Sequence, residues 1–188
     1  MSRVERLRLF VAVDVPAEHR IAVARDIEPL RRALPEARWT ALESQHITLK
    51  FLGWTPSDRL EVIERAVQRA SAAHERAEVS LSGIGAFPSE RRARVLWVGL
   101  DDRRGLLARI ASDLERALEP LGYAREKPRF TPHLTLARLK TPARLDDSAT
   151  EVSWGDAGPF LVSSVVLYRS RLSASGARYE ALRAFALR

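Results

Sequence analysis

A short alternating pattern occurs twice in this chain and constrains its fold more than any other feature. The two copies are QHITLKFLG, which contains His46 and Thr48, and PHLTLARLK, which contains His133 and Thr135. Alternation of polar and apolar residues is typical of a β-strand with one buried face, so in each copy His and Thr share one face and Ile or Leu occupies the other. The sequence therefore predicts two equivalent half-buried strands, each of which presents an imidazole and a hydroxyl on its polar face.

The repetition of this polar pair points to a functional site. Histidine titrates near neutral pH, and a threonine hydroxyl two positions further on can donate a hydrogen bond to an anionic oxygen. Two such pairs that face each other across a cleft would supply an acid, a base and two hydroxyl ligands, as cleavage of a phosphoester requires. The alternative is that these residues only pack. The other two histidines, His19 and His74, lie in helix-like segments without a repeated companion.

Length and composition favour one domain with a substantial core. The chain has 188 residues, of which 46% are hydrophobic, and no cysteine. The lack of cysteine rules out disulfides and thiolate sites and agrees with a reducing cytoplasm. Because no apolar run reaches the roughly 18 residues needed to cross a bilayer, we expect a cytoplasmic protein without a membrane segment. The net charge of +7 favours a polyanionic partner such as RNA.

Apolar periodicity and the Pro and Gly positions predict an irregular alternation of strands and helices. The expected strands cover 8–15, 38–40, 45–53, 77–82, 94–100, 132–139, 151–155, 160–170 and 177–187, and the expected helices cover 16–34, 56–73 and 103–118. Such an order indicates an α+β fold that is bilobal, with a pseudo-two-fold arrangement of two mostly antiparallel sheets, helices on the outside and a central cleft. Since no Gly/Ser-rich linker divides the chain, we expect a single bilobal domain over residues 1–188 whose lobes exchange strands.

Several reaction types lack their sequence signatures. The chain contains no G-x-x-x-x-G-K-[ST] loop, no G-x-G-x-x-G after a strand and no G-x-S-x-G elbow. The strand-face neighbour of each motif histidine is threonine, which is a poor zinc ligand, so we expect no metal and no cofactor. Acid–base chemistry on a phosphate without a metal ion fits these residues best.

Five ordered blocks of the sequence resemble a known family. The chain is similar to the RNA 2′,3′-cyclic phosphodiesterases, also called 2′-5′ RNA ligases, of the two-histidine phosphoesterase superfamily. The similar blocks, which span nearly the whole chain, are RLFVAVDVP, QHITLKFLG, GAFPSERRARVLWVGL, FTPHLTLARLK and YRSRLSASGARYEAL. The resemblance implies a bilobal fold with both motifs in one cleft. It also implies cofactor-independent hydrolysis of a 2′,3′-cyclic phosphate end to a 2′-phosphate, and a weaker, reversible joining of RNA through a 2′-5′ bond.

The resemblance also implies roles for particular residues. His46 is expected to be the proton donor to O3′ and His133 the proton acceptor from water, while Thr48 and Thr135 hold the phosphate oxygens. Arg138 is expected to complete the phosphate pocket. Its strand parity is opposite to that of the second motif's His and Thr, so a bulge, a strand end or a long reach is needed; the alternative is an exposed strand-end arginine.

Aromatic and basic residues near the motifs leave several interpretations open. Phe51 takes the place in the first motif that Arg138 takes in the second, and it is either a base contact or a core residue. Trp54 is a further candidate for a base contact. The basic cluster Arg125, Lys127 and Arg129 directly precedes the second motif and is a candidate for phosphate contact or solvated surface.

Two other functions remain open from sequence alone. One is a non-catalytic module that binds RNA or a nucleotide in the same cleft. The other is a phosphodiesterase that acts on another small cyclic phosphate, such as a cyclic nucleotide or ADP-ribose 1″,2″-cyclic phosphate. The expected partner is therefore RNA with a 2′,3′-cyclic phosphate end or a small cyclic nucleotide, and the expected oligomeric state is a monomer.

Overall fold

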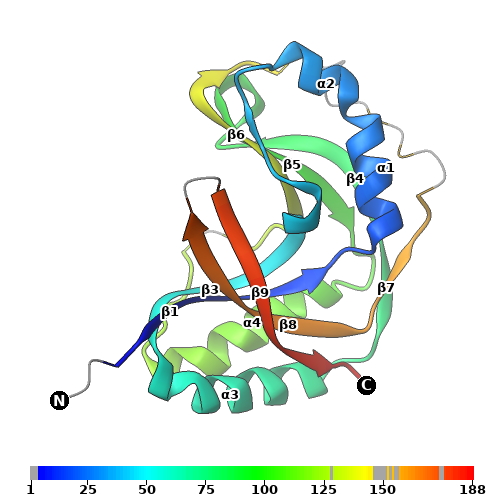
Figure 1. Ribbon diagram of the computed structural model, residues 1–188. Helices are drawn as coiled ribbons and strands as arrows, with labels where there is room; N and C mark the ends of the chain where they lie inside the picture. Colours follow the sequence, from blue (N-terminus) through cyan, green and yellow to red (C-terminus); the bar gives the residue numbers. More distant parts are fainter. Residues whose placement is uncertain (1–3, 128, 146–151, 153, 155–156, 174–175) are drawn as a thin grey trace.

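In a computed structural model that describes residues 4–127, 129–145, 152, 154, 157–173 and 176–188, the alternating segments form nine strands (Figure 1). The strands are β1 (Arg6–Asp14), β2 (Arg38–Trp39), β3 (His46–Pro56), β4 (Ala77–Phe87), β5 (Ala93–Asp101), β6 (His133–Ala143), β7 (Phe160–Val162), β8 (Ser164–Ser173) and β9 (Gly176–Ala186). Their order in the sheet is β7-β4-β5-β6-β3-β1-β8-β9, and β2 also pairs with β6. The strand pairs are antiparallel.

The sheet has two halves that are related by a pseudo-two-fold. The central strands β3 and β6 carry the two His-x-Thr motifs; β1 and β5 flank them, followed by β8 and β4 and then by β9 and β7. The halves are joined between β3 and β6 at the residue pair Ile47–Leu134. The predicted α+β fold is thus confirmed; the two antiparallel sheets that were expected are the halves of one nine-stranded sheet, which meet along this short contact.

The described residues also form four α-helices, which lie outside the sheet (Figure 1), and four 3₁₀ turns. The α-helices are α1 (Ala17–Asp26), α2 (Glu28–Ala33), α3 (Leu60–Ala72) and α4 (Leu106–Leu118), and the 3₁₀ turns are η1 (Leu42–Ser44), η2 (Ser57–Arg59), η3 (Glu90–Arg92) and η4 (Glu119–Leu121). Helices α3 and α4 contact each other and the half that contains β3, β8 and β9. Within the described residues, no helix is both long and apolar enough to span a bilayer.

The two halves exchange segments of the chain. Helix α1 follows β1, but its His19 Nε2 donates a hydrogen bond to the Gly158 carbonyl (2.9 Å) and its ring contacts Phe160 of β7 in the other half. Helix α4 follows β5 and packs on β3. Each half is therefore built from residues distant in sequence, which explains why no linker separates them.

Alternation along β1 shows how the sheet divides into a core face and a cleft face. Leu7, Leu9, Val11 and Val13 are at most 6% exposed and belong to the hydrophobic core with residues of α3 and α4. The intervening positions, from Arg8 to Asp14, point to the opposite side. We call this side the cleft face, because the register of β1 with β3 places it beside the first motif.

Two predicted elements prove to be divided. The helix expected over 16–34 is interrupted at Ile27, because Pro29 has no backbone N–H to continue the ladder, and α2 starts again after it. The strand expected over 160–170 is split at Ser163. Its first part, β7, pairs with β4, and its second part, β8, pairs with β1, so the chain crosses between the halves at this point.

Glycines that predict turns lie inside longer strands. Strand β4 runs through Gly85, where an added Cβ would lie 2.2 Å from a ring carbon of Trp97, so this glycine permits close packing and the predicted loop begins only near Pro88. Strand β3 continues past Gly53, which has φ +67°, to Pro56. The strand expected over 151–155 falls mainly outside the described residues; of its positions, Val152 and Trp154 are described and lie outside any strand.

Candidate active site

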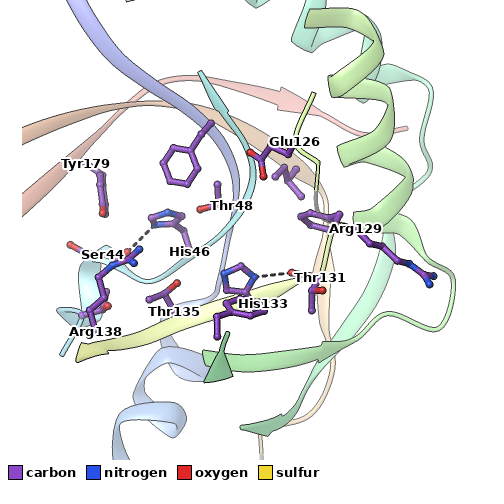
Figure 2. A pocket seen from close by; sticks show the side chains of 15 residues that line it. Ser44, His46, Thr48, Glu126, Arg129, Thr131, His133, Thr135, Arg138 and Tyr179 are labelled. Atoms are coloured by element: carbon purple, nitrogen blue, oxygen red, sulfur yellow. Dashed lines mark hydrogen bonds between the residues drawn. The ribbon is translucent and has the colours of Figure 1, made fainter. Parts of the chain in front are cut away.

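The two His-x-Thr motifs occupy equivalent positions, at the first residues of β3 and β6. The Ile47–Leu134 pair sets the register between them, so that His46 lies opposite Thr135 and His133 lies opposite Thr48. Ile47 and Leu134 are completely buried. Figure 2 shows the four polar side chains together on the cleft face. The predicted convergence of the two pairs is therefore present in the structure.

A pocket of about 360 Å³ lies over these four side chains (Figure 2). It is lined by Thr40, Ser44, His46, Thr48, Leu49, Phe51, Phe87, Glu126, Arg129, Phe130, Thr131, His133, Thr135, Arg138 and Tyr179. Both histidines, both threonines, Arg138 and Phe51 are among them, whereas Trp54, the further candidate for a base contact, is not. The structure brings these six side chains together in one pocket.

A β-bulge in each motif strand brings the residue five positions after the histidine onto the cleft face. In β6, Leu96 pairs with Ala137 but Trp97 pairs with Thr135, so Leu136 is an extra residue and Arg138 shares the face of Thr135. An equivalent shift in β3 follows Thr48 and turns Phe51 to the cleft. Of the three routes expected for Arg138, namely a bulge, a strand end or a long reach, the structure shows the bulge.

Each motif histidine is held by a carbonyl two residues before it. His46 Nδ1 donates a hydrogen bond to the Ser44 carbonyl (2.8 Å), and His133 Nδ1 donates one to the Thr131 carbonyl (2.7 Å), as the dashed lines in Figure 2 show. Because a carbonyl only accepts, Nδ1 must carry the proton in both rings. The Nε2 atom of each neutral ring is then an acceptor, ready to take a proton.

Aromatic side chains and a carboxylate surround His46. The ring of Phe10 lies 4.8 Å from the imidazole, and the ring of Tyr179 meets it edge-on at 4.9 Å. Asp14 pairs with His46 in the β1–β3 register, and the Tyr168 hydroxyl donates a hydrogen bond to its carboxylate. Burial lowers the pKa of His46, while the hydrogen bond to the Ser44 carbonyl and the negative charge of Asp14 act in the opposite direction.

His133 has a different electrostatic environment. Phe87 meets its ring edge-on at 5.1 Å. Burial lowers the pKa of His133 and the hydrogen bond to the Thr131 carbonyl opposes this effect; the positive charge of Arg138 lowers the pKa further, and Glu126 raises it. Among charged neighbours, the carboxylate of Asp14 has the largest effect on the pKa of His46, and the guanidinium of Arg138 has the largest effect on the pKa of His133.

Several pocket residues escaped the sequence reasoning. Tyr179 and Phe87 come from β9 and β4, whose positions depend on long-range pairing that no local pattern reveals. Ser44 and Thr131, however, extend the repeat to [ST]-x-His-x-Thr, a signal that was present in the sequence. From the basic cluster before β6, Arg129 lines the pocket, whereas Arg125 is paired with Glu119 (2.9 Å).

Metal binding has no evident ligand set in the described part of the chain. There, no three His, Asp or Glu side chains are grouped so as to hold a metal ion. The polar groups that converge in the pocket are two imidazoles, hydroxyls, the carboxylate of Glu126 and the guanidinium groups of Arg129 and Arg138.

The fold and the pocket define a class of α+β protein in which two His-x-Thr strands meet at a pseudo-two-fold. The chain belongs to the 2′-5′ RNA ligase superfamily, whose family model matches residues 17–173. An RNA 2′,3′-cyclic phosphodiesterase of Methanothermobacter thermautotrophicus is 33% identical over 97% of this chain and 100% of its own length. One from Aeropyrum pernix is 39% identical over 74% of this chain and 80% of its own length.

Solved structures resemble nearly the whole chain. A Thermus thermophilus protein superimposes with a TM-score of 0.80 at 29% identity, covering 97% of this chain and 98% of its own. E. coli LigT in its apo form has a TM-score of 0.78 at 25% identity and covers 97% of this chain and 98% of its own. LigT has also been crystallised in complexes with 3′-AMP and with phosphate.

Proposed function

We propose that this chain hydrolyses the 2′,3′-cyclic phosphate at an RNA end to a 2′-phosphate, by general acid–base catalysis and without a metal ion. The observation that carries the proposal is the pair of histidines whose Nδ1 atoms are both bound to carbonyls, which leaves two Nε2 atoms for proton transfer in one pocket. The names of the relatives and the phosphate and 3′-AMP complexes of E. coli LigT support this substrate class.

The phosphate would be held by groups that lie across the pseudo-two-fold. Thr48 and Thr135 each offer a hydroxyl donor from opposite halves of the sheet, and Arg138 adds a fixed positive charge. A negative charge accumulates on the phosphate oxygens as water attacks. Donors that are already oriented stabilise this charge without reorganisation. Phe51, which is 49% exposed in the pocket wall, is suited to stack against the terminal base.

The reaction then needs two proton transfers. His133 takes a proton from water as the water oxygen forms a bond to phosphorus, and protonated His46 gives its proton to O3′ as the P–O3′ bond breaks. The product carries a 2′-phosphate and a free 3′-hydroxyl, and exchange with solvent restores both imidazoles. If the 5′-hydroxyl of a second RNA replaces water, the same transfers form a 2′-5′ bond.

The surrounding charges favour this assignment of acid and base. Asp14 stabilises the protonated form of His46, and Arg138 stabilises the neutral form of His133. These two charges, taken by themselves, favour a shared proton on His46 over one on His133. A ring that holds the proton is the one prepared to protonate a leaving oxygen.

The test is hydrolysis of a nucleoside 2′,3′-cyclic phosphate in EDTA, without ATP, with the product isomer identified by phosphorus NMR. We expect full activity and a 2′-phosphate product. Thr48→Val and Thr135→Val keep the β-branched shape but lack the hydroxyl, and each should lower kcat/KM with little change in thermal stability. Activity that chelation abolishes and a divalent ion restores, or a 3′-phosphate product, would overturn the proposal.

A further inference from the structure

The cleft face continues beyond the pocket along β1 and β3. The register of these strands pairs Phe10 with Phe51 and Arg8 with Trp54, and residues paired in this way have side chains on the same face. The register shift between the two pairs is a second bulge in β3, next to Gly53 with its φ of +67°. This bulge turns Trp54 to the same face as Phe51.

A transverse row of residues connects Trp54 to the wall of the pocket. Tyr179, which lines the pocket, pairs with Ser170 in the β8–β9 register. Arg8 Nη1 donates a hydrogen bond to Ser170 Oγ (3.2 Å), and Arg8 pairs with Trp54. Tyr179, Ser170, Arg8 and Trp54 thus form one row across four strands, which we call the outer row.

The outer row offers an exposed ring and an uncompensated positive charge. Trp54 is 56% exposed, although aromatic residues in strands usually pack in the core. Its backbone carbonyl accepts a hydrogen bond from Arg6 Nη2 (2.9 Å), which fixes this end of β3. Among the described residues, neither Arg6 nor Arg8 forms an ion pair with a carboxylate. A stacking surface beside guanidinium groups whose charge no described carboxylate pairs with suits a base and its phosphate.

We propose that the outer row binds the RNA chain that precedes the cyclic phosphate, with a base stacked on Trp54 and a backbone phosphate at Arg8. The proposal rests on the proposed function and makes its substrate a single-stranded oligonucleotide. The continuity of the row with the pocket, together with its positive charge, selects this occupant. Along β3, Trp54 lies farther from His46 than Phe51 does. A base stacked on Phe51 therefore leaves Trp54 for a second nucleotide.

The experiment compares two substrates in wild type and in variants of the row. One substrate is a trinucleotide with a 2′,3′-cyclic phosphate end, and the other is the corresponding nucleoside 2′,3′-cyclic phosphate. Trp54→Ala should lower the ratio of their kcat/KM values by about 5- to 100-fold, the range expected for loss of one stacked base. Trp54→Phe should restore most of the ratio, and Ile21→Ala, which removes a similarly exposed apolar side chain from α1, should leave it unchanged.

A second measurement uses binding instead of turnover. A labelled trinucleotide with a 2′-phosphate end should bind more weakly to Arg8→Gln. The slope of log Kd against log salt should fall by about 0.7, the value for one phosphate contact in a single strand. Thermal unfolding of each variant, compared with wild type, identifies any that fails to fold.

Three results would overturn the inference. An unchanged substrate ratio in Trp54→Ala would show that the ring contacts no RNA, and an equal loss on both substrates would make Trp54 a support of the pocket. A wild-type dimer that Trp54→Ala converts to monomer would identify the row as a contact between copies of the chain. If wild type hydrolyses neither substrate, the proposed function itself fails, which is a different outcome from these three.

Discussion

At the scale of single residues, the two histidines are the simplest test of the mechanism. His46→Ala and His133→Ala should each lower kcat by about 100-fold or more, as expected for loss of one proton-transfer partner. The double variant should lose much less than the product of the two, because both residues act on one transition state. Steady-state kinetics with a nucleoside 2′,3′-cyclic phosphate measures these effects. Near-normal turnover in either single variant would remove that histidine from the mechanism.

Asp14 allows the assignment of the acid to be tested separately. Its carboxylate raises the pKa of His46, so Asp14→Asn should lower that pKa further. Because the acid must be protonated, the descending limb of the kcat/KM profile should move to lower pH. Glu61→Gln, which removes an exposed carboxylate on α3, is the matched control and should not move the limb. An unshifted limb in Asp14→Asn would indicate that His46 is not the acid of the free enzyme.

At the scale of secondary structure elements, a buried ion pair fixes β3 to the helix beneath it. Lys50, 1% exposed, donates hydrogen bonds to Glu115 of α4 (2.7 and 2.8 Å) and to the Ala124 carbonyl (2.6 Å). Ala124 begins the segment that leads to His133 and the second motif. Lys50 therefore links the strand that carries the first motif to the segment that precedes the second motif.

Removal of the lysine alone should be strongly destabilising. Lys50→Met leaves the Glu115 carboxylate without its partner and should cost about 2–4 kcal/mol in the free energy of unfolding. Lys50→Met combined with Glu115→Leu should recover most of this loss, since no buried charge then remains unpaired. Urea unfolding of the wild type, the single variant and the double variant provides the comparison. A double variant that is as unstable as the single one would contradict this explanation.

Strand pairing also explains which features of the site could be predicted from the sequence. The His-x-Thr faces were predictable because alternation is a local property of a strand. The position of Arg138 depends on a bulge that arises only when β6 pairs with β5, so parity alone left it open. Tyr179 reaches the pocket through the pairing of β9 with β8 and of β8 with β1, and its neighbours in sequence carry no sign of this. Local patterns thus predicted the motifs, and long-range pairing determined what surrounds them.

At the scale of the whole molecule, the pocket should make stability depend on pH. The pKa values of His46 and His133 are both lower in the folded protein than the ordinary value of 6.5. Between 6.5 and the folded values the unfolded chain binds more protons, so stability is full above pH 6.5 and is lost as pH falls through the folded pKa values. Burial of the two neutral imidazoles therefore lowers the free energy of unfolding in mild acid.

A comparison with a variant isolates this effect from other titrating groups. We expect the free energy of unfolding of wild type, measured by urea titration between about pH 8 and pH 5, to fall more steeply than that of His46→Gln combined with His133→Gln. Phosphate should reduce the difference, because a bound anion favours protonated imidazoles and binds only the folded state. Parallel pH dependences for wild type and variant would show that the imidazoles are not perturbed by folding.

The position of β1 between β3 and β8 has a consequence for how the protein is made. Leu9 pairs with Gly53 on one side and with Arg169 on the other, so the sheet half that carries His46 needs strands from both ends of the sequence. During synthesis β1 and β3 leave the ribosome early, yet β1 keeps an unpaired edge until β8 has been translated. The nascent chain therefore exposes an unpaired strand edge while the residues between β1 and β8 are synthesised. Strand β8 then covers this edge, and β9 pairs with the far side of β8.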